Sequence, residues 1–366
     1  MTPDEARLPT RASPRRILVR ANNWIGDVVM ISPAMKALRE TYPSARIDVL
    51  VRSHVRDCFT DHPWVDGVVL HDPQGAHRGL RGLFRLAGEL RRNQYDLAVL
   101  FVKAFGSALL ARLAGIPRRI GYDTDRRGFL LTDPIHETAA DRGIHHVDYF
   151  LKVAAAAGCD VSRIPRRVYF PVDAASDVFA DGFLGAARTD RFSFLAAFAV
   201  GASKGPRAWH AERFAALAAG LASRHGAGVL VVGGPTDRAD ARLILTAAGD
   251  AAVDATGRTT IRQMAALIKR CRVFVGNDSG PMHLASALDV PVLALFGPGS
   301  PAKTAPFMPP DRFIAMTNDF QCSPCRQDFF KECTPAPSGK PMCLETISIA
   351  QAEESLTILL KRSGVV

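Results

Sequence analysis

Short apolar runs alternate with amphipathic segments along the first half of the chain. The apolar runs that predict strands are residues 15–22, 45–51, 65–72 and 95–102. Between them, residues 27–43 and 80–93 repeat apolar positions with the period of a helix. Strands that alternate with helices at this spacing indicate a parallel, doubly wound α/β sheet.

The alternation restarts in the second half, after a looser stretch at about 165–190 that we interpret as the link between two domains. Strands are expected within residues 192–203, 227–235, 272–278 and 291–298, and helices at 210–226, 238–249, 260–271, 281–289 and 347–362. A chain of 366 residues has the length of two domains. We therefore expect a disordered tail at 1–14 and two Rossmann-like domains, at 15–175 and 176–345, that face a central cleft.

Composition narrows the class of protein. Apolar residues make up 48% of the chain, and no apolar run reaches the roughly 18 residues that a membrane span needs. The N-terminus lacks the apolar core of a secretory signal, so a cytoplasmic protein is the default. The net charge of +10 favours nucleic acid, phosphorylated ligands or an anionic membrane face, or else marks a solvated arginine-rich surface. Few aromatic residues lie among the arginines, so we expect no nucleic-acid partner.

The loop after the first expected strand reads RANNWIGD and holds Asn23, Trp24, Gly26 and Asp27. Gly26 permits an unusual backbone conformation or a close approach. Asp27 stands where a helix begins, so its carboxylate has two interpretations. It is either a helix N-cap or a general base that faces the cleft from the end of a strand.

Two loops of the second half combine glycines with polar side chains. The loop at 201–214 contains Ser203, Lys204 and Arg207, and amides at a helix start together with cations can bind an anion. Asp237 follows two glycines at the end of another strand, where an acidic residue can hold a ribose hydroxyl. The alternatives are a polar surface loop for the first and a helix N-cap for the second.

The segment GNDSGPMH, residues 276–283, joins a further strand to a helix. Asp278 and Ser279 are residue types that cap helices. Gly280 has no side chain, so its backbone amide is accessible to a ligand. A pyrophosphate there would meet free amides, the helix dipole and the imidazole of His283. The alternative for His283 is a hydrogen-bonded structural histidine.

These loops together resemble glycosyltransferase family 9, the ADP-heptose:lipopolysaccharide heptosyltransferases, with the heptosyltransferase II type as the best match. The matching segments are NNWIGDVVMISPAMKALRETYP, GYDTDRRGFLLTDPI followed by HHVDYFLKVAAAAG, the loop at 201–209, and GNDSGPMHLASALDVPVLALFGPGSP. They span the chain from about residue 15 to 350, and the first and last are specific.

The resemblance implies a GT-B fold, with the acceptor held by the first domain and the nucleotide sugar by the second. The helix at 346–366 would cross back to the first domain. The implied reaction is an inverting transfer of heptose from ADP-heptose to a heptose of the lipopolysaccharide inner core. It would need no metal or other cofactor and would take place at the cytoplasmic face of the inner membrane.

The resemblance also implies residue roles. Asp27 matches the family's proposed base, and Asn23, Trp24 and Gly26 form the acceptor-side loop. Arg207 stands where the family has a phosphate-binding Lys, a role that Lys204 could share. The other expected donor contacts are Ser203, Asp237, Asp278, Ser279, Gly280 and His283.

Other functions stay open from the sequence. The chain could use a different nucleotide sugar, or be a non-catalytic nucleotide- or glycan-binding protein of envelope assembly. Asp27 argues against the latter, because binding alone needs no carboxylate there. A Rossmann dehydrogenase is disfavoured, because no G-x-G-x-x-G follows the first strand.

Four of the seven cysteines cluster near the C-terminus, at Cys322, Cys325, Cys333 and Cys343. A structural zinc site or another metal cluster is one interpretation, although the second and third spacings are not standard ones. Free thiols and disulfides are the alternatives, and disulfides are disfavoured in a reducing cytosol.

Overall fold

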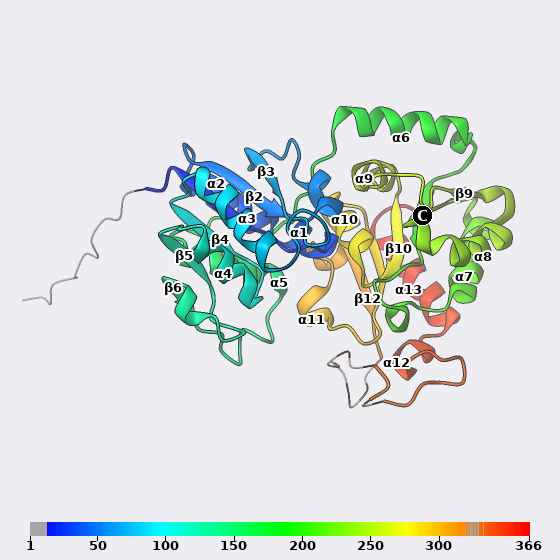
Figure 1. The fold of residues 1–366 in the computed structure, drawn as a ribbon. Coiled ribbons are helices and arrows are strands. Elements are labelled where there is room, and N and C mark those ends of the chain that lie inside the picture. The colour runs from blue at the N-terminus through cyan, green and yellow to red at the C-terminus, as the bar shows by residue number, and fades with distance from the viewer. Residues whose placement is uncertain are drawn as a thin grey trace, which may run out of the picture.

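The structure is a computed structural model that describes residues 13–318, 320, 322, 325, 327, 329–331 and 333–366. It contains two six-stranded sheets, with strand orders β3-β2-β1-β4-β5-β6 and β12-β11-β10-β7-β8-β9. All neighbouring strands are parallel. Counted from its own first strand, each sheet has the order of a dinucleotide-binding fold. The α/β class and the two Rossmann-like units are therefore confirmed (Figure 1).

The strands of the first sheet are β1 (Arg16–Arg20), β2 (Arg46–Val51), β3 (Gly67–Leu70), β4 (Leu97–Leu100), β5 (Arg118–Tyr122) and β6 (Asp133–Ile135). Those of the second are β7 (Leu195–Ala199), β8 (Gly228–Val231), β9 (Ala252–Asp254), β10 (Val273–Asn277), β11 (Val292–Leu295) and β12 (Phe313–Met316). The sequence did not predict β5, β6, β9 or β12. Two of these, β6 and β9, have three residues each, too few to show a period.

Helices cover both faces of the first sheet. They are α1 (Ile25–Met30), α2 (Ser32–Thr41), α3 (Gly79–Arg92), α4 (Phe105–Leu113) and α5 (His146–Ala156). In the first sheet, β2 and β3 follow one another on one side of β1, whereas β4, β5 and β6 follow one another on its other side. Because such crossovers are right-handed, α1 and α2 lie on one face, with α5, while α3 and α4 lie side by side on the other (Figure 1).

The single helix expected after the first loop is instead two helices that break at Ile31. Pro33 has no N–H to donate to the carbonyl of Val29, a bond that a continuous helix would need. The Ser32 hydroxyl donates to that carbonyl at 2.6 Å and accepts from the N–H of Tyr169 at 2.8 Å. The break frees α1 to stand at the junction of the two domains.

The remaining helices are α6 (Ala174–Ala186), α7 (Ala211–His225), α8 (Arg238–Ala248), α9 (Ile261–Lys269), α10 (Gly280–Ala287), α11 (Pro301–Thr304), α12 (Met342–Glu345) and α13 (Ile349–Arg362). α6 was not predicted, because it falls in the stretch interpreted as a link. Its N-cap, Asp173, accepts from the N–H of Ser176 at 2.6 Å, and the helix packs against α9. Within the described part of the chain, no helix is long and apolar enough to cross a membrane.

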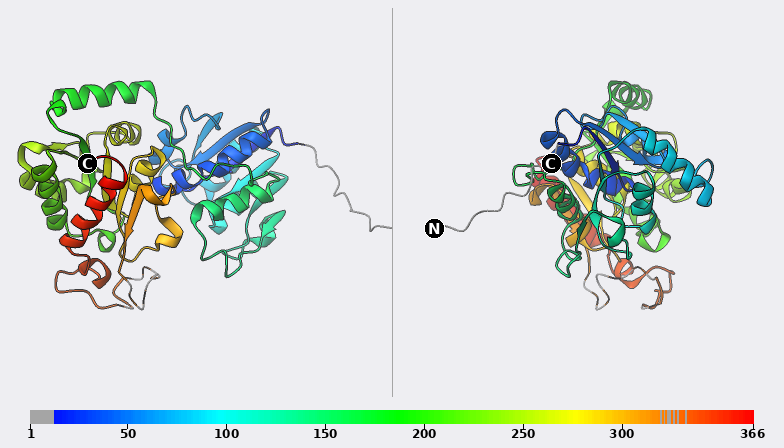
Figure 2. Two further views of the ribbon diagram at one scale, coloured as in Figure 1. Left: turned by 180° about the vertical axis from the view of Figure 1, so that it is seen from behind. Right: turned by 60° about the vertical axis from the view of Figure 1, so that its left-hand side comes forward.

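Two expectations for the chain ends need comment. Residues 1–12 of the predicted tail at 1–14 lie outside the described residues. The expected crossing of the helix at 346–366 to the first domain is wrong, because α13 packs against α7, β11 and β12 (Figure 2). Leu356, Leu359 and Leu360 bury their side chains there, among residues of the second sheet.

The two domains meet where the first turns of α1 and α10 cross. A Cβ added to Gly280 would lie 2.9 Å from the Cβ of Ile25, and one added to Gly26 would lie 2.7 Å from Cδ2 of His283. Each helix therefore places a glycine against a larger side chain of the other. A side chain at either glycine would push the two domains apart.

We expect Gly280→Ala to destabilise the protein by about 1–3 kcal/mol, because overpacking a close contact forces the backbone to shift. The free energy of unfolding, measured in urea, tests this. Gly182→Ala on α6 is the matched control, because no atom lies within 4 Å of its added Cβ. That variant should gain about 0.5–1 kcal/mol from helix propensity. Equal stability of Gly280→Ala and the wild type would contradict a tight α1–α10 contact.

Candidate active site

Strand pairing brings the predicted loops together in two groups. Arg20 at the end of β1 pairs with Leu100 at the end of β4, so the loops at 21–24 and 101–104 leave the first sheet side by side. Gly276 of β10 pairs with Ala199 of β7, which brings the loops at 200–207 and 278–280 together. Both groups lie at the carboxyl ends of their strands, where α/β proteins bind ligands.

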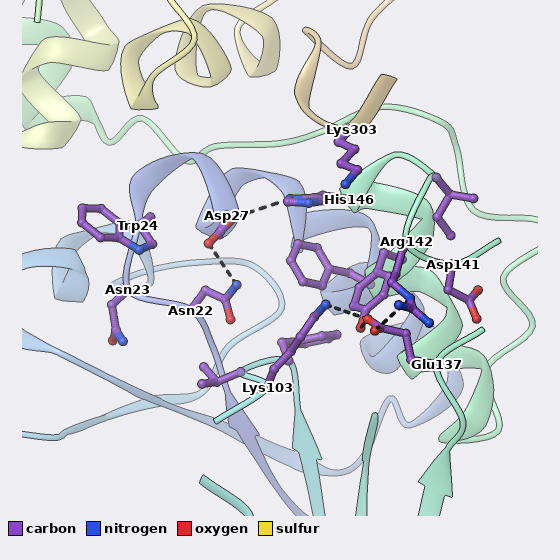
Figure 3. A pocket seen from close by; sticks show the side chains of 15 residues that line it. Asn22, Asn23, Trp24, Asp27, Lys103, Glu137, Asp141, Arg142, His146 and Lys303 are labelled. Atoms are coloured by element: carbon purple, nitrogen blue, oxygen red, sulfur yellow. Dashed lines mark hydrogen bonds and ion pairs between the residues drawn. The ribbon is translucent and has the colours of Figure 1, made fainter. Parts of the chain in front are cut away.

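A cavity of about 480 Å³ lies beside the first group (Figure 3). Its lining residues are Asn22, Asn23, Trp24, Asp27, Phe101, Val102, Lys103, Glu137, Asp141, Arg142, Ile144, His146, Tyr149, Phe150 and Lys303. Lys303 belongs to α11 in the second half of the chain, so the cavity lies between the domains. Apolar rings and several charged groups together suit a sugar-like ligand with anionic substituents.

Asp27 lies in the first turn of α1 with its carboxylate toward the cavity (Figure 3). The residue at the N-cap position is Trp24, so the N-cap interpretation of Asp27 is wrong. Asn22 donates to Oδ2 of Asp27 at 3.0 Å, and 19% of the Asp27 side chain is exposed. Burial raises the pKa of Asp27 to about 6, while the Asn22 hydrogen bond and the Arg207 charge favour the ionised form. Near neutral pH such a carboxylate is ionised and basic enough to accept a proton.

His146, at the start of α5, is an ionisable neighbour of Asp27 that the sequence did not single out. Its Nδ1 lies 3.9 Å from Oδ1 of Asp27 and has no hydrogen-bond partner among the described residues. Burial lowers the pKa of His146 to about 4, so the imidazole is neutral where Asp27 is ionised. The paired histidines at 145–146, directly before an apolar helix, were the available signal.

A second group of charges lines the cavity farther from Asp27. Glu137 accepts from Lys103 at 2.8 Å and from the Tyr149 hydroxyl at 2.7 Å, and Arg142 lies 3.8 Å from it. The Lys103 ammonium also lies 4.3 Å from the centre of the Tyr149 ring. Lys303 has no ion-pair partner within the described ranges of the chain. In this group the three cations outnumber Glu137, and Asp141, which also lines the cavity, is paired with Lys152. The sequence did not predict these cations as site residues.

The second group of loops is tied together by Asn277. Its amide donates to the carbonyl of Val200 at 2.7 Å, and its side-chain oxygen accepts from the N–H of Trp209 at 2.8 Å. Arg207 donates to the backbone carbonyl of Asp278 at 3.0 Å and forms an ion pair with its carboxylate. Burial raises the pKa of Asp278, and the charge of Arg207 opposes that change.

The other predicted donor residues lie around this pair. Ser203 and Lys204 are exposed on the loop, and the Lys204 ammonium lies 5.4 Å from the centre of the Phe329 ring. Ser279 occupies the N-cap position of α10 without capping it, and its Oγ has no hydrogen-bond partner in the described chain. Asp237 accepts from the N–H of Gly234 at 2.8 Å as the third residue of a capping box, but at the N-cap position of α8 its side chain makes no capping hydrogen bond, so the N-cap interpretation is not supported.

His283 differs most from its expected role. It is 4% exposed, and its ring lies against Gly26. Burial lowers the pKa of His283 to about 3, with a further contribution from His145, His146 and Arg207. The imidazole is therefore neutral and packed at the domain junction, and its expected role as a donor contact stays a prediction.

The four clustered cysteines line a separate cavity of about 200 Å³. Cys322, Cys333 and Cys343 form no disulfide. Burial raises the pKa of Cys343 to about 11, and the three other cysteines raise it further. Among the residues that the structure describes, no group of three or more His, Cys, Asp or Glu side chains is arranged to hold a metal ion. The metal interpretation therefore stays a prediction.

Known proteins share both the sequence pattern and the fold of this chain. The sequence profile of glycosyltransferase family 9 (heptosyltransferase) matches residues 83–333, which is more than half of the chain. The chain belongs to glycosyltransferase family 9. It is 30% identical over 322 residues to lipopolysaccharide heptosyltransferase 2 of Salmonella typhimurium, across 83% of this chain and 89% of that protein.

Solved structures agree with the family assignment. The E. coli ADP-heptose lipopolysaccharide heptosyltransferase II structure matches with a TM-score of 0.76 and 25% identity, over 95% of this chain and 99% of that one. A family 9 glycosyltransferase from Veillonella parvula matches with a TM-score of 0.82 and 24% identity, over 95% and 98% of the two chains. The fold is thus GT-B, and the protein is a glycosyltransferase enzyme of the heptosyltransferase family.

The environment of Asp27 predicts the pH dependence of this enzyme. A base must be ionised, so kcat/KM should fall as the pH drops below about 6. Asn22→Ala removes a hydrogen bond that favours the ionised form, so the acidic limb should move to higher pH by about one unit. Asn23→Ala is the matched control, because Asn23 donates no hydrogen bond to Asp27. An unchanged profile for Asn22→Ala would contradict Asp27 as the titrating group.

Proposed function

We propose that the protein transfers heptose from ADP-heptose to a heptose of the lipopolysaccharide inner core, with inversion and without a catalytic metal. The single observation that carries the proposal is the position of Asp27. Its partly desolvated carboxylate lines the cavity between the domains and is close enough to Arg207 to be influenced by that charge. A base is thus adjacent to a cationic loop, as transfer from a sugar diphosphate requires.

In the proposed reaction, an acceptor hydroxyl in the cavity attacks the anomeric carbon of the donor sugar. Asp27 takes the hydroxyl proton while the new glycosidic bond forms. The bond from the anomeric carbon to the diphosphate oxygen breaks at the same time, and its electron pair leaves with ADP. Attack from the side opposite the leaving group inverts the anomeric centre.

The leaving diphosphate needs positive charge, and Arg207 is the strongest candidate in the second group of loops. A guanidinium can bind phosphate bidentately, so Arg is chemically suited to the position where the family has Lys. Its Nε has no hydrogen-bond partner among the described residues, which supports this role. The unpartnered Oγ of Ser279 and the first-turn amides of α10 supply further donors. Lys204 and Ser203 would complete the contacts from the exposed part of the loop, and Asp237 would face the nucleoside.

The acceptor side of the cavity supports an anionic inner-core ligand. Lys103, Arg142 and Lys303 line it, and exposed Trp24 offers an aromatic face at its edge. Because such an acceptor is anchored in lipid, we propose that the enzyme works at the cytoplasmic face of the inner membrane as a peripheral protein. Use of another nucleotide sugar is the second candidate within the same fold.

We expect Asp27→Ala to reduce heptose transfer by at least about 10²-fold, because general base catalysis is lost. ADP binding should stay at the wild-type level or tighten, since the substitution removes a negative charge near the diphosphate. Transfer is measured as ADP release, and binding by calorimetry. Near-normal turnover of Asp27→Ala would remove Asp27 as the base.

A thermal shift panel separates the donor alternatives. Stabilisation by ADP or ADP-heptose, but not by UDP or GDP sugars, supports the proposal. Stabilisation by UDP sugars alone would favour the second candidate. Binding of ADP-heptose without transfer to any core oligosaccharide would favour a non-catalytic binding protein.

We further propose that the side chains of the four-cysteine cavity rearrange to bind a structural metal ion such as zinc, since they do not form a metal site in the arrangement that the structure describes. Four thiolates suit zinc or iron. Neighbouring thiolates repel one another, and a bound cation would offset that repulsion and favour the deprotonated form of each cysteine. We expect about one metal ion per chain in protein purified without chelator, and its loss in Cys343→Ser. Cys58→Ser is the control, because Cys58 is buried in the first domain. The proposal is contradicted if protein purified without chelator contains neither zinc nor iron.

A further inference from the structure

Large apolar side chains are exposed on one side of the first domain. Leu80 is 74% exposed, Phe84 61% and Phe129 75%, and Phe105 is also exposed. Leu80 and Phe84 are one turn apart on α3, so they form a single stripe, while Leu86 and Leu90 of the same helix face the core. Exposed aromatic residues of this size, gathered in one region, mark an interaction surface.

The four side chains share one edge of the domain. α3 and α4 run parallel on the same face of the sheet, and Arg91 near the end of α3 donates to the carbonyl of Leu113 at the end of α4 at 2.5 Å. Because both helices rise by about 1.5 Å per residue, the first turn of α4 lies level with the middle turns of α3. Phe84 and Phe105 therefore lie at the same level of two adjacent helices, and the ring centre of Phe105 lies 6.1 Å from that of Phe129. We call Leu80, Phe84, Phe105 and Phe129 the apolar edge.

Arginines surround the apolar edge. Arg78, Arg81 and Arg126 are exposed and have no ion-pair partner in the described chain, and Arg85 pairs only with Glu89, at 3.2 Å. Long basic side chains beside exposed aromatic rings are typical of proteins that enter the headgroup layer of an anionic membrane.

The apolar edge adjoins the active-site cavity. Lys103 lines the cavity and precedes Phe105 by two residues. Arg127, which is fully buried, donates to the carbonyls of Tyr122 and Ala104 and to the Ser107 hydroxyl. These bonds hold the loop with Phe129 against the start of α4, so a surface bound to the apolar edge would lie at the rim of the cavity.

We propose that the apolar edge docks the enzyme on a bilayer that contains anionic phospholipid. The apolar side chains enter the interface, and the arginines pair with lipid phosphates. The proposal rests on the proposed function, because a lipid-anchored acceptor must reach the cavity from a membrane. A second copy of the chain fits less well as the occupant. A two-fold contact would bring Arg78, Arg81 and Arg126 of both copies together, and none of the three has an ion-pair partner within the described chain.

Sedimentation of the full chain with vesicles, without substrates, tests the docking. Wild-type protein should pellet with vesicles of phosphatidylethanolamine and phosphatidylglycerol, and much less with phosphatidylcholine alone. Phe84→Ser/Phe129→Ser should weaken partitioning at least about tenfold, because two aromatic rings no longer leave water. Arg81→Glu/Arg85→Glu should remove the preference for phosphatidylglycerol.

Matched controls come from α8 of the second domain, which also presents a neighbouring arginine and leucine. Leu243→Ser and Arg242→Glu should leave vesicle binding unchanged. Transfer to a water-soluble, deacylated core oligosaccharide should stay at the wild-type level in all these variants, because none alters a cavity residue. Transfer to the full acceptor embedded in vesicles should fall in the apolar-edge variants alone.

Two results would overturn the docking proposal. The first is vesicle binding that is absent in the wild type or equal in the apolar-edge variants. The second is a concentration-dependent dimer that the same substitutions abolish. The two proposals can fail separately. Vesicle binding without heptose transfer to either acceptor would support the docking proposal and contradict the proposed function. Transfer to the soluble acceptor without vesicle binding would support the proposed function and contradict the docking proposal.

Discussion

The contact between α1 and α10 is the constraint on which the active site depends. Two glycines, Gly26 and Gly280, let the first turns of these helices approach so closely that a methyl group would not fit at either position. Asp27 follows the first glycine, and Ser279 precedes the second. The same contact that joins the domains therefore brings Asp27 and the loop with Asp278 and Arg207 into one cleft. A looser junction would leave two separate half-sites.

Burial at this junction also shifts the pKa values of its ionisable groups, and their different partners give them different roles. Asp27 and Asp278 are both desolvated, which raises the pKa of each, but their partners differ. Arg207 neutralises Asp278, so that carboxylate serves structure and charge balance. Asp27 accepts a hydrogen bond from the neutral amide of Asn22 and is influenced by the Arg207 charge without pairing with it, so it keeps its capacity to accept a proton. The nearby imidazoles of His146 and His283 are neutral because burial lowers their pKa values, so arginine and lysine provide the positive charge of the cleft.

Patterns within short segments of the sequence predicted the elements whose formation depends mainly on neighbouring residues. The apolar runs located the central strands, and glycine-rich polar loops after them located Asp27, Arg207 and Asp278. The break at Ile31 depends on Pro33 and was readable in principle from the sequence. The interpretation of α6 as a linker failed because the side chains that it buries, Ser176, Ala180 and Leu184, are few and mostly small, and the helix packs mainly on α9.

The sequence by itself determined the α/β class, the two-domain order and the loops that carry chemistry, because periodicity and residue type act over a few positions. Only the tertiary structure decided which loops share a cavity and what each side chain does there. His146 and Lys303 are remote from Asp27 in the chain, so no local pattern could place them beside the same cavity. His283 and Asp27 both stand near helix starts, and only the close approach of two helices decided that the imidazole is buried while the carboxylate lines the cavity. Burial and long-range contact set those differences, and neither is a property of a short segment.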